Sequence, residues 1–558
     1  MEERRAPRGR RMLAAACAVA LATALVSCGG GKTGPTDQPS TAEAARFMTQ
    51  ATFGATSVEQ IMGVQGTGIA GWLDQQFEMP AAALHVDYVQ NQEPRVDDPA
   101  TRIREIYPTE EMSYEAVWQQ WLHDPAQLRA RTAFALAQIV VISNVAPDLR
   151  PYAMSSYMDM LNRNAFGSYR ALLRDVTLHP AMGYYLNMLQ SAKDDPAKGT
   201  HPNENYAREV LQLFSIGLGQ LELDGTPKLD AQGRPIPTYD EAVVKGFARA
   251  FTGWTFANAT SFHSADENAR AAWTTPMKPD PAYHSSGTKQ LLDGFVLPAG
   301  GTPESDLEAA LDNIFNHPNV GPFIGRQLIQ RFVASNPSPA YIARVATVFN
   351  DNGGGVRGDL RAVVRAVLLD PEARAVPAAG NASAGKQREP VVRFAHVLRA
   401  LGARSANGIN SIHHLDSADS GLGQSPLLSP SVFNFYSPNF RQPGAIAQAG
   451  LYAPEFQITT ETSAVGALNF FASLFNSEGY GNGSARLVLN YAPLEALADD
   501  PPKLVERLDL LLFSARMSDG TRMRLVTMLD AMRARSARER VKAALIVTAL
   551  SPDFVIQQ

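Results

Sequence analysis

From residue 41 onward, apolar and polar positions alternate along the chain with the period of an α-helix. The clearest example is the segment Thr238–Trp254. Its apolar side chains fall on one stripe of a helix: Val243, Phe247, Ala250, Phe251 and Trp254. Thr238 and Glu241 have the spacing of a capping box, in which two side chains satisfy the free N–H groups of the first turn. The pattern predicts an amphipathic helix that begins near Thr238.

Further segments have the same period, and each begins at a residue suited to capping. They are Ser168–Leu178, Asp306–Phe315 and Asp359–Leu369, followed near the end of the chain by Ala537–Leu550. Ala133–Ile142 is apolar around Gln138 and predicts one buried helix. We also expect the tryptophans on apolar helical faces, Trp118, Trp121 and Trp254, to lie in the core.

Strand signals are few. Leu221–Pro237 is rich in Asp, Gly and Pro, which predicts a small surface hairpin, and Gln290–Leu297 predicts a short strand. The Gly, Ala and Ser residues of 376–386 mark the best internal loop break. We therefore expect a mainly α protein, with one large multi-helix domain over residues 42–558 and small surface β-hairpins.

The N-terminus has the three parts of an export signal. A basic region precedes the apolar stretch Met12–Val26, whose 15 residues are too few for a membrane span of about 20. The stretch ends in Leu25-Val26-Ser27-Cys28, the pattern of a bacterial lipobox. We predict that residues 1–27 are a lipoprotein signal peptide, that Cys28 carries acyl chains, and that residues 28–41 form a flexible tether. The alternative is an ordinary signal peptide with a cysteine there by chance.

The residues around the lipobox bear on export and location. Arg10 and Arg11 resemble part of a twin-arginine export motif, which leaves two export routes open. Gly29 and Gly30 follow the cysteine, so there is no aspartate to retain the protein at the inner membrane. We expect an exported protein whose partner is the membrane, through the lipid anchor at Cys28, most simply at the outer membrane.

Cysteine count and charge exclude several classes of function. The chain has two cysteines, and Cys17 lies within the predicted signal, so Cys28 is the only thiol of the mature protein. Internal disulfides, a cysteine nucleophile and iron–sulfur clusters are therefore excluded. The formal charge is −5, and removal of an arginine-rich signal makes it more negative. A mildly acidic chain without a basic run is not expected to bind nucleic acid.

The most promising polar cluster opens a helix near residue 201. The candidate site residues are His201, Asn203, Glu204, Asn205, Arg208 and Glu209. Asn203 suits an N-cap and Glu204 suits the positive end of the helix dipole. On a helical wheel the carboxylates and the arginine share one face, where they could bind a polar ligand or divide acid and base roles. The alternatives are a solvated face with Glu204 paired to Arg208, and a buried polar network that serves architecture only.

Other candidate chemistry is weaker. His413-His414 is the only close histidine pair, and the chain lacks the His-Glu-x-x-His pattern of zinc hydrolases. We expect the histidines of His179-Pro180 and His317-Pro318 to cap carbonyls of the helices before them. Asp224 and Asp230 lack the spacing of a calcium loop and are expected to make turns. No metal, no cofactor and no specific catalytic residue is predicted.

Several segments together resemble the bacterial family called domain of unknown function 1800. They are Ala45-Arg46-Phe47, Ala51-Thr52-Phe53-Gly54-Ala55-Thr56, the segment from Pro202 to Glu209, Phe251-Thr252-Gly253-Trp254, the segment from His317 to Ile324, and Ser429-Pro430-Ser431-Val432-Phe433-Asn434. The resemblance implies one extended, mostly helical domain and an exported location. It also implies an exported partner related to sulfatases and alkaline phosphatases, since members of the two groups are often encoded side by side. It implies no reaction.

Three hypotheses follow from the sequence. The first is a cell-envelope lipoprotein that binds or processes an envelope or extracellular polymer, with the polar face in its main cleft. The second is a non-enzymatic helical module for binding or assembly, in which Glu209 is structural and its loss lowers the melting temperature. The third is a metal-dependent hydrolase that uses His201 with Glu204 or Glu209.

Overall fold

The computed structural model describes residues 38–81, 85–92, 108–145, 149–378 and 381–558. The predicted signal peptide and residues 28–37 of the predicted tether, Cys28 among them, lie outside the described residues. Gln38–Gln558 groups by its contacts into one unit. This unit is mainly α-helical with small antiparallel strand pairs, which confirms the predicted fold class.

The first half of the unit is organised around one buried helix, α6 (Pro151–Asn164), of which twelve residues are buried. It packs against α3, α4, α5, α7, α8 and α11. The other helices of this half are α1 (Thr41–Ala51), α2 (Val58–Glu78), α3 (His85–Asn91), α4 (Glu110–His123), α5 (Gln127–Ala137), α7 (Tyr169–Leu178), α8 (Pro180–Tyr185), α9 (Asn205–Gln212), α10 (Glu241–Ala250), α11 (Arg270–Thr274) and α12 (Pro303–Asn316).

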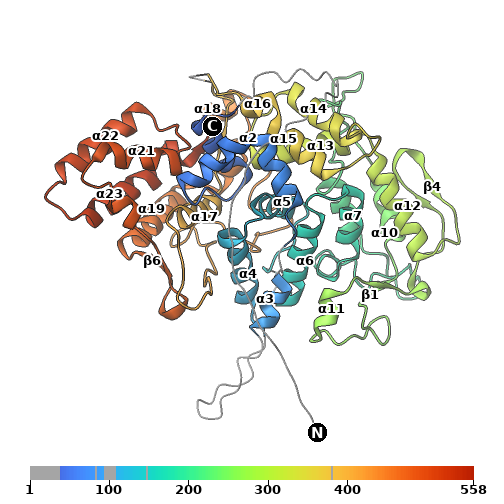
Figure 1. Cartoon of the computed structure of the whole chain (residues 1–558). Coiled ribbons are helices and arrows are strands. Elements are labelled where there is room, and N and C mark those ends of the chain that lie inside the picture. Colours follow the sequence, from blue (N-terminus) through green and yellow to red (C-terminus); the bar gives the residue numbers. More distant parts are fainter. Residues whose placement is uncertain (1–37, 82–84, 93–107, 146–148, 379–380) are drawn as a thin grey trace, which may run out of the picture. The chain divides into compact units, whose positions relative to one another are not determined.

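The second half contains two groups of packed helices. In one, α14 packs against α13 and α15; in the other, α23 packs against α19 and α22, and α22 against α21 (Figure 1). The helices are α13 (Val320–Phe332), α14 (Pro339–Asn350), α15 (Leu360–Leu369), α16 (Pro371–Arg374), α17 (Pro390–Ala400), α18 (Ala445–Gln448), α19 (Glu461–Asn476), α20 (Ala492–Glu495), α21 (Pro501–Leu512), α22 (Asp519–Ala531), α23 (Ala537–Leu550) and α24 (Pro552–Val555).

Strands are short and pair antiparallel in twos. The pairs are β1 (Trp254–Thr255) with β2 (Lys278–Pro279), β3 (Lys289–Gln290) with β4 (Val296–Leu297), β5 (Lys386–Gln387) with β8 (Ile556–Gln557), and β6 (Gly479–Tyr480) with β7 (Leu487–Val488). The predicted strand at 290–297 is thus a small hairpin. The hairpin predicted at 221–237 is present as isolated bridges, among them Leu221 with Pro227 and Leu229 with Pro235.

Several helix boundaries agree with the sequence. Helix α15 begins after Asp359, whose side chain accepts a hydrogen bond from the Ala362 N–H, and α23 has the predicted bounds. Helix α7 begins after Ser168. Trp118, Trp121 and Trp254 are buried as expected. Within the described residues, no helix combines the length and the apolar character needed to cross a bilayer.

Other boundaries were wrong for identifiable reasons. Helix α10 begins after Asp240, whose side chain accepts from the Val243 N–H; the Thr238 hydroxyl instead donates to the Gly217 carbonyl. An aspartate nearer the helix outcompetes the predicted capping box. The predicted helix through 142 stops at Ala137, with Gln138 as its C-cap. Helix α12 begins three residues before Asp306, which is inside it and pairs with Lys289 at 2.6 Å.

The proline-linked histidines also act differently from the prediction. His179 is the N-cap of α8, and its Nδ1 accepts from the Ala181 N–H at 3.2 Å. The Nδ1 atom of His317 accepts from the Asn319 N–H at 3.1 Å. Both rings therefore serve the free N–H groups of the segment that follows, because an imidazole nitrogen without a proton is an acceptor. The expected turns at Asp224 and Asp230 are confirmed, since both side chains accept backbone N–H groups of their own loops.

Candidate functional site

Helix α9 carries the polar cluster predicted from the sequence. Its apolar side, formed by Tyr206, Ala207, Val210 and Leu211, is buried and fixes the helix on the core. The helix begins one residue later than predicted, with Glu204 in the N-cap position and without a capping side chain. Asn203 is outside the helix, where its side chain accepts from the Asn205 N–H at 2.9 Å. The asparagine thus closes the entry turn of the helix.

The loop before α9 is held by a carboxylate. Asp194 accepts from His201 Nδ1 at 2.8 Å and from Arg249 Nε at 3.3 Å, which connects the loop to α10. The hydrogen bond from His201 lowers the pKa of the Asp194 carboxyl. The His201 side chain is 77% exposed. His201 is therefore near the predicted face, but its partner is Asp194 and not Glu204 or Glu209.

The exposed part of the face is a chain of surface ion pairs. Arg208 lies 3.0 Å from Glu204 and 3.4 Å from Glu241 of α10. The first of these pairs was predicted from the sequence and is confirmed. The Asn205 side chain donates to Asn187, a residue in the left-handed backbone region with φ of 59°, at 2.8 Å. Exposed pairs of this kind stabilise a fold by about 0–1 kcal/mol each.

Glu209 differs from the rest of the face because it is half-buried. Burial raises the pKa of its carboxyl, and Arg208 opposes this only in part. Tyr185 and Tyr239 lie close enough to be affected by the Glu209 charge, and burial raises the pKa of each to about 12. Within the described residues, Glu209 Oε2 and the Tyr239 hydroxyl are buried without a hydrogen-bond partner. A half-buried carboxyl with a raised pKa could hold a proton or accept a ligand hydrogen bond.

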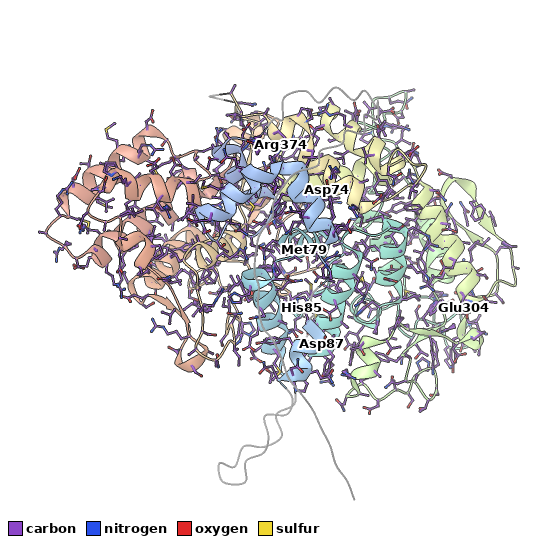
Figure 2. The ribbon with its side chains drawn as sticks, in the orientation of Figure 1. Asp74, Met79, His85, Asp87, Glu304 and Arg374 are labelled. Atoms are coloured by element: carbon purple, nitrogen blue, oxygen red, sulfur yellow. The ribbon has the colours of Figure 1, made fainter. Side chains whose placement is uncertain are left out.

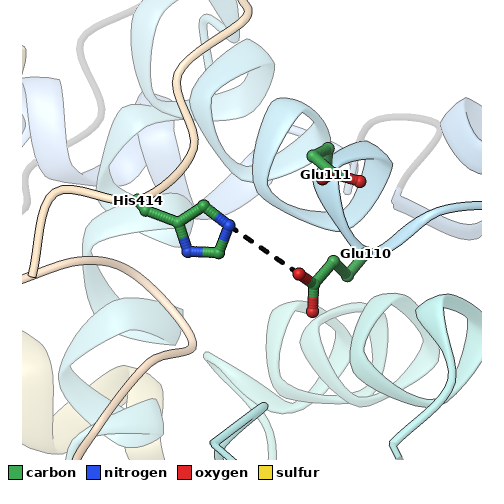
Figure 3. Close-up of side chains that lie close together, drawn as sticks. All are labelled: Glu110, Glu111 and His414. Carbon is green, nitrogen blue, oxygen red and sulfur yellow. Dashed lines mark ion pairs between the residues drawn. The ribbon is translucent and has the colours of Figure 1, made fainter. Parts of the chain in front are cut away.

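A second group of acidic residues and histidine was not predicted. Glu110 and Glu111 of the first turn of α4 lie close to His414 of the loop after α17, and the His414 ring is directed toward Glu110 (Figure 3). Their ligand atoms lie within 4.8 Å of one another, and His414 Nε2 is 3.7 Å from Glu110. The adjacent His413 pairs with Glu115 at 3.1 Å. The only sequence signal was the histidine pair, because the glutamates lie some 300 residues earlier in the chain.

This group bears on the metal hypothesis. Of the described residues, only Glu110, Glu111 and His414 have a spacing that could hold a metal ion, and none of the three belongs to the α9 face. Imidazole and carboxylate are ligands suited to zinc and similar cations. The hydrolase hypothesis based on His201 with Glu204 or Glu209 therefore gains no support from the geometry.

The sequence also did not reveal a charged centre in the core. Lys386 Nζ lies 2.7 Å from Glu455 Oε1, and both side chains are at most 2% exposed. Glu389 accepts from the side-chain amides of Gln138 and Gln424. Two buried arginines complete the group, which we call the buried centre: Arg131, Arg331, Lys386, Glu389 and Glu455. Burial lowers the pKa of the Lys386 ammonium and raises that of the Glu455 carboxyl.

A small cavity of about 30 Å³ adjoins the buried centre. Its lining includes Gln138 and Gln424, the two amides that donate to Glu389, and a volume of this size is enough for a water molecule. Leu427 and Asn434, which also line it, have φ of 64° and 65°, values unusual for residues other than glycine. Asn434 ends the Ser429–Asn434 segment named above for its family resemblance. None of the five cavities described in the structure is lined by residues 204–209.

Comparison with known proteins gives one result. No curated protein and no solved structure matches the chain. A family model described as "Protein of unknown function (DUF1800)" matches residues 46–556. The match includes both the α9 face and the buried centre. Because it covers nearly the whole chain, the protein belongs to this family, as the segment resemblance indicated.

Proposed function

We propose that this protein is an envelope lipoprotein, anchored through Cys28, whose α9 face binds or helps to process a polar envelope or extracellular polymer together with an exported partner. One observation carries the proposal: Glu209 presents a buried carboxyl oxygen without a partner beside an otherwise exposed polar face. A buried acceptor without a hydrogen bond costs about 1–3 kcal/mol. A hydroxyl or amide donor of a polymer that displaces the side chains covering this oxygen would remove that cost on binding.

The surroundings of Glu209 suit a polymer rich in hydroxyl or amide groups. The raised pKa of its carboxyl allows it to donate as well as accept a hydrogen bond over a wider pH range. Tyr239 adds a hydroxyl that has no partner within the described residues, and Arg208 and Asn205 add donors at the exposed edge. An open face fits an extended chain better than a small molecule, which needs enclosure.

The test is complementation of a deletion strain with Glu209→Gln and Arg208→Ala variants. We expect both to fold, to reach the membrane fraction and to leave the deletion phenotype uncorrected. Glu506→Gln, an exposed glutamate of α21, is the control and should complement fully. Full complementation by both α9 variants would contradict the proposed role of the α9 face. Recovery of the wild-type protein in the soluble periplasm would contradict the proposed lipid anchor.

The second candidate is a helical module for binding or assembly, favoured by the ion pairs that connect α9 to α10. Arg208 joins Glu204 to Glu241, and Asp194 joins His201 to Arg249, so the polar residues fasten two elements together. In this case the α9 variants should complement as long as they fold, and capture of the partner should persist.

A further inference from the structure

A second cavity, distant in sequence from α9, is lined by three arginines. It has a volume of about 150 Å³ and lies between α1, the turn after α21 and the segment of α24 and β8. Its polar lining includes Arg46, Arg388, Arg516, Thr49, Ser514 and Asp553. Ser514 and Ala515 have φ of 59° and 57°, and this left-handed turn brings the chain back so that Arg516 reaches the cavity. The local backbone therefore presents a cation here despite its conformational cost.

The two buried arginines are held by neutral acceptors. Arg46 donates to the Ala375 carbonyl at 2.7 Å and to the Arg374 carbonyl. Arg388 Nε donates to the Phe554 carbonyl at 3.0 Å, and its NH1 donates to the His396 ring at 2.8 Å. Neither guanidinium has a carboxylate partner within the described residues. These contacts fix the positions of the two charges without neutralising them.

The third arginine adds a free donor. Arg516 NH2 donates to the Gln558 side chain at 3.0 Å, while its Nε is buried and has no partner among the described residues. Burial and, after it, the Arg516 charge lower the pKa of Arg46, and the charge of Glu43 opposes this only in part. Arg374, labelled in Figure 2, adds another buried cation close to Arg46, and its Nε and NH1 likewise have no partner within the described residues. The positive charges therefore repel one another across a small space.

The negative charge nearby is already engaged. Asp553 is the only carboxylate side chain of the lining, and its Oδ2 accepts from the Ser518 N–H at 2.9 Å and from the Ser518 hydroxyl at 2.7 Å. The side chains of the lining, three arginines and one aspartate, thus carry more positive than negative charge. Burial of charge without a counter-charge is costly, so an anion of suitable size would stabilise this arrangement.

We propose that this cavity binds a small tetrahedral oxyanion of the phosphate class. Arginine is suited to such a ligand because its planar guanidinium offers parallel N–H donors to two oxygens. The hydroxyls of Thr49 and Ser514 lie at the wall and are hydrogen-bonded to each other at 2.7 Å, so when Thr49 donates to Ser514 the Ser514 hydroxyl offers one further donor. The lining leaves room for a single anionic group with water. The site does not depend on the function proposed for α9.

Calorimetric titration of the intact mature protein with inorganic phosphate tests the proposal. We expect one saturable site in the wild type, and at least tenfold weaker binding in Arg516→Gln because the free Nε and one positive charge are lost. Arg524→Gln changes an exposed arginine of the neighbouring α22 that does not line the cavity, and it should bind as the wild type does. Arg516→Lys keeps the charge but not the planar donors, and it should fall between the two.

Parallel titrations with sulfate and with a phosphate monoester distinguish the sources of the anionic group. Binding of all three identifies a general oxyanion site, and preference for the monoester identifies the phosphoryl group of a larger molecule. Absence of saturable phosphate and sulfate binding in the wild type would overturn the proposal. So would wild-type affinity in both Arg516 variants. If Arg516→Gln fails to fold, the affinity of Arg516→Lys decides.

Discussion

The α9 face and the buried centre contain similar charged groups in opposite surroundings. On the face, Arg208 forms ion pairs with two glutamates at the surface, and its side chain is 40% exposed. In the buried centre, Lys386 and Glu455 are almost fully removed from solvent. Water screens the first set, so its pairs contribute little to stability. The second set has lost its hydration, and each charge depends on its partner.

The difference in solvent exposure also affects what the charged residues can do. On the α9 face, a side chain that loses its ion-pair partner is hydrated by water, so these residues are free to contact a ligand. In the buried centre, burial lowers the pKa of Lys386 and raises the pKa of Glu455. Both shifts favour the neutral forms, so the charged pair is held at a cost in free energy. Variants of the two regions should therefore differ in the size of their effects on stability.

The largest effect is expected for Lys386→Met. The change leaves Glu455 buried without its cation and also removes donors to the Gln330 and Arg331 carbonyls. We expect the free energy of unfolding, measured by urea denaturation, to fall by about 3–5 kcal/mol at neutral pH.

A double variant tests whether the missing charge partner is the cause. Lys386→Met combined with Glu455→Leu replaces the pair by apolar groups and should recover most of the lost stability, because no charge is then left unpaired. If the double variant is as unstable as the single one, the ion pair is not what the buried centre depends on.

An intermediate effect, of opposite sign, is expected for Glu209→Gln. Burial raises the pKa of Glu209, so the folded state favours the protonated form, and the wild type loses stability as the pH rises through that pKa. Glutamine stays neutral. At pH 7 the variant should therefore have a higher melting temperature than the wild type, and its free energy of unfolding should be higher by an amount on the order of 1 kcal/mol. Near pH 4 the two proteins should melt at the same temperature.

This result would contradict the second hypothesis from the sequence, the helical module in which Glu209 is structural and its loss lowers the melting temperature. A variant that melts several degrees lower at pH 7 would restore that earlier interpretation. Gln212→Glu, one turn further along α9, is a suitable control, since it adds a carboxylate to the same face at a site of intermediate burial. It should not produce the pH-dependent gain.

The fold could be predicted where local signals decide it. The period of apolar residues and a single capping aspartate are enough to set α15, because both act within a few residues of the chain. The start of α10 was missed because Thr238 and Asp240 both suit a cap, and the choice depends on a tertiary contact of Thr238 with Gly217. Local patterns cannot rank two such caps.

In the candidate site, too, contacts between residues close in sequence could be predicted, and contacts that depend on the fold could not. The Glu204–Arg208 pair was predictable because residues four apart meet on one helix face. The partner of His201 is also close in sequence, but it depends on the course of a loop. The buried centre draws its residues from positions between 131 and 455, and the arginine-lined cavity from positions between 46 and 558. Only the folded chain brings these residues together, so no spacing in the sequence indicates them.

The smallest effect is expected for Arg208→Ala. It removes two surface pairs, with Glu204 and Glu241, and should lower the free energy of unfolding by less than about 1 kcal/mol. The difference from wild type should shrink as salt is added, because exposed charges are screened. Arg234→Ala, which breaks an exposed pair of the same i,i+4 spacing with Asp230, is the matched control and should behave alike. A loss of stability as large as that of Lys386→Met would mean that the Arg208 ion pairs stabilise the fold as strongly as the buried pair does. The proposed contrast between the two regions would then be wrong.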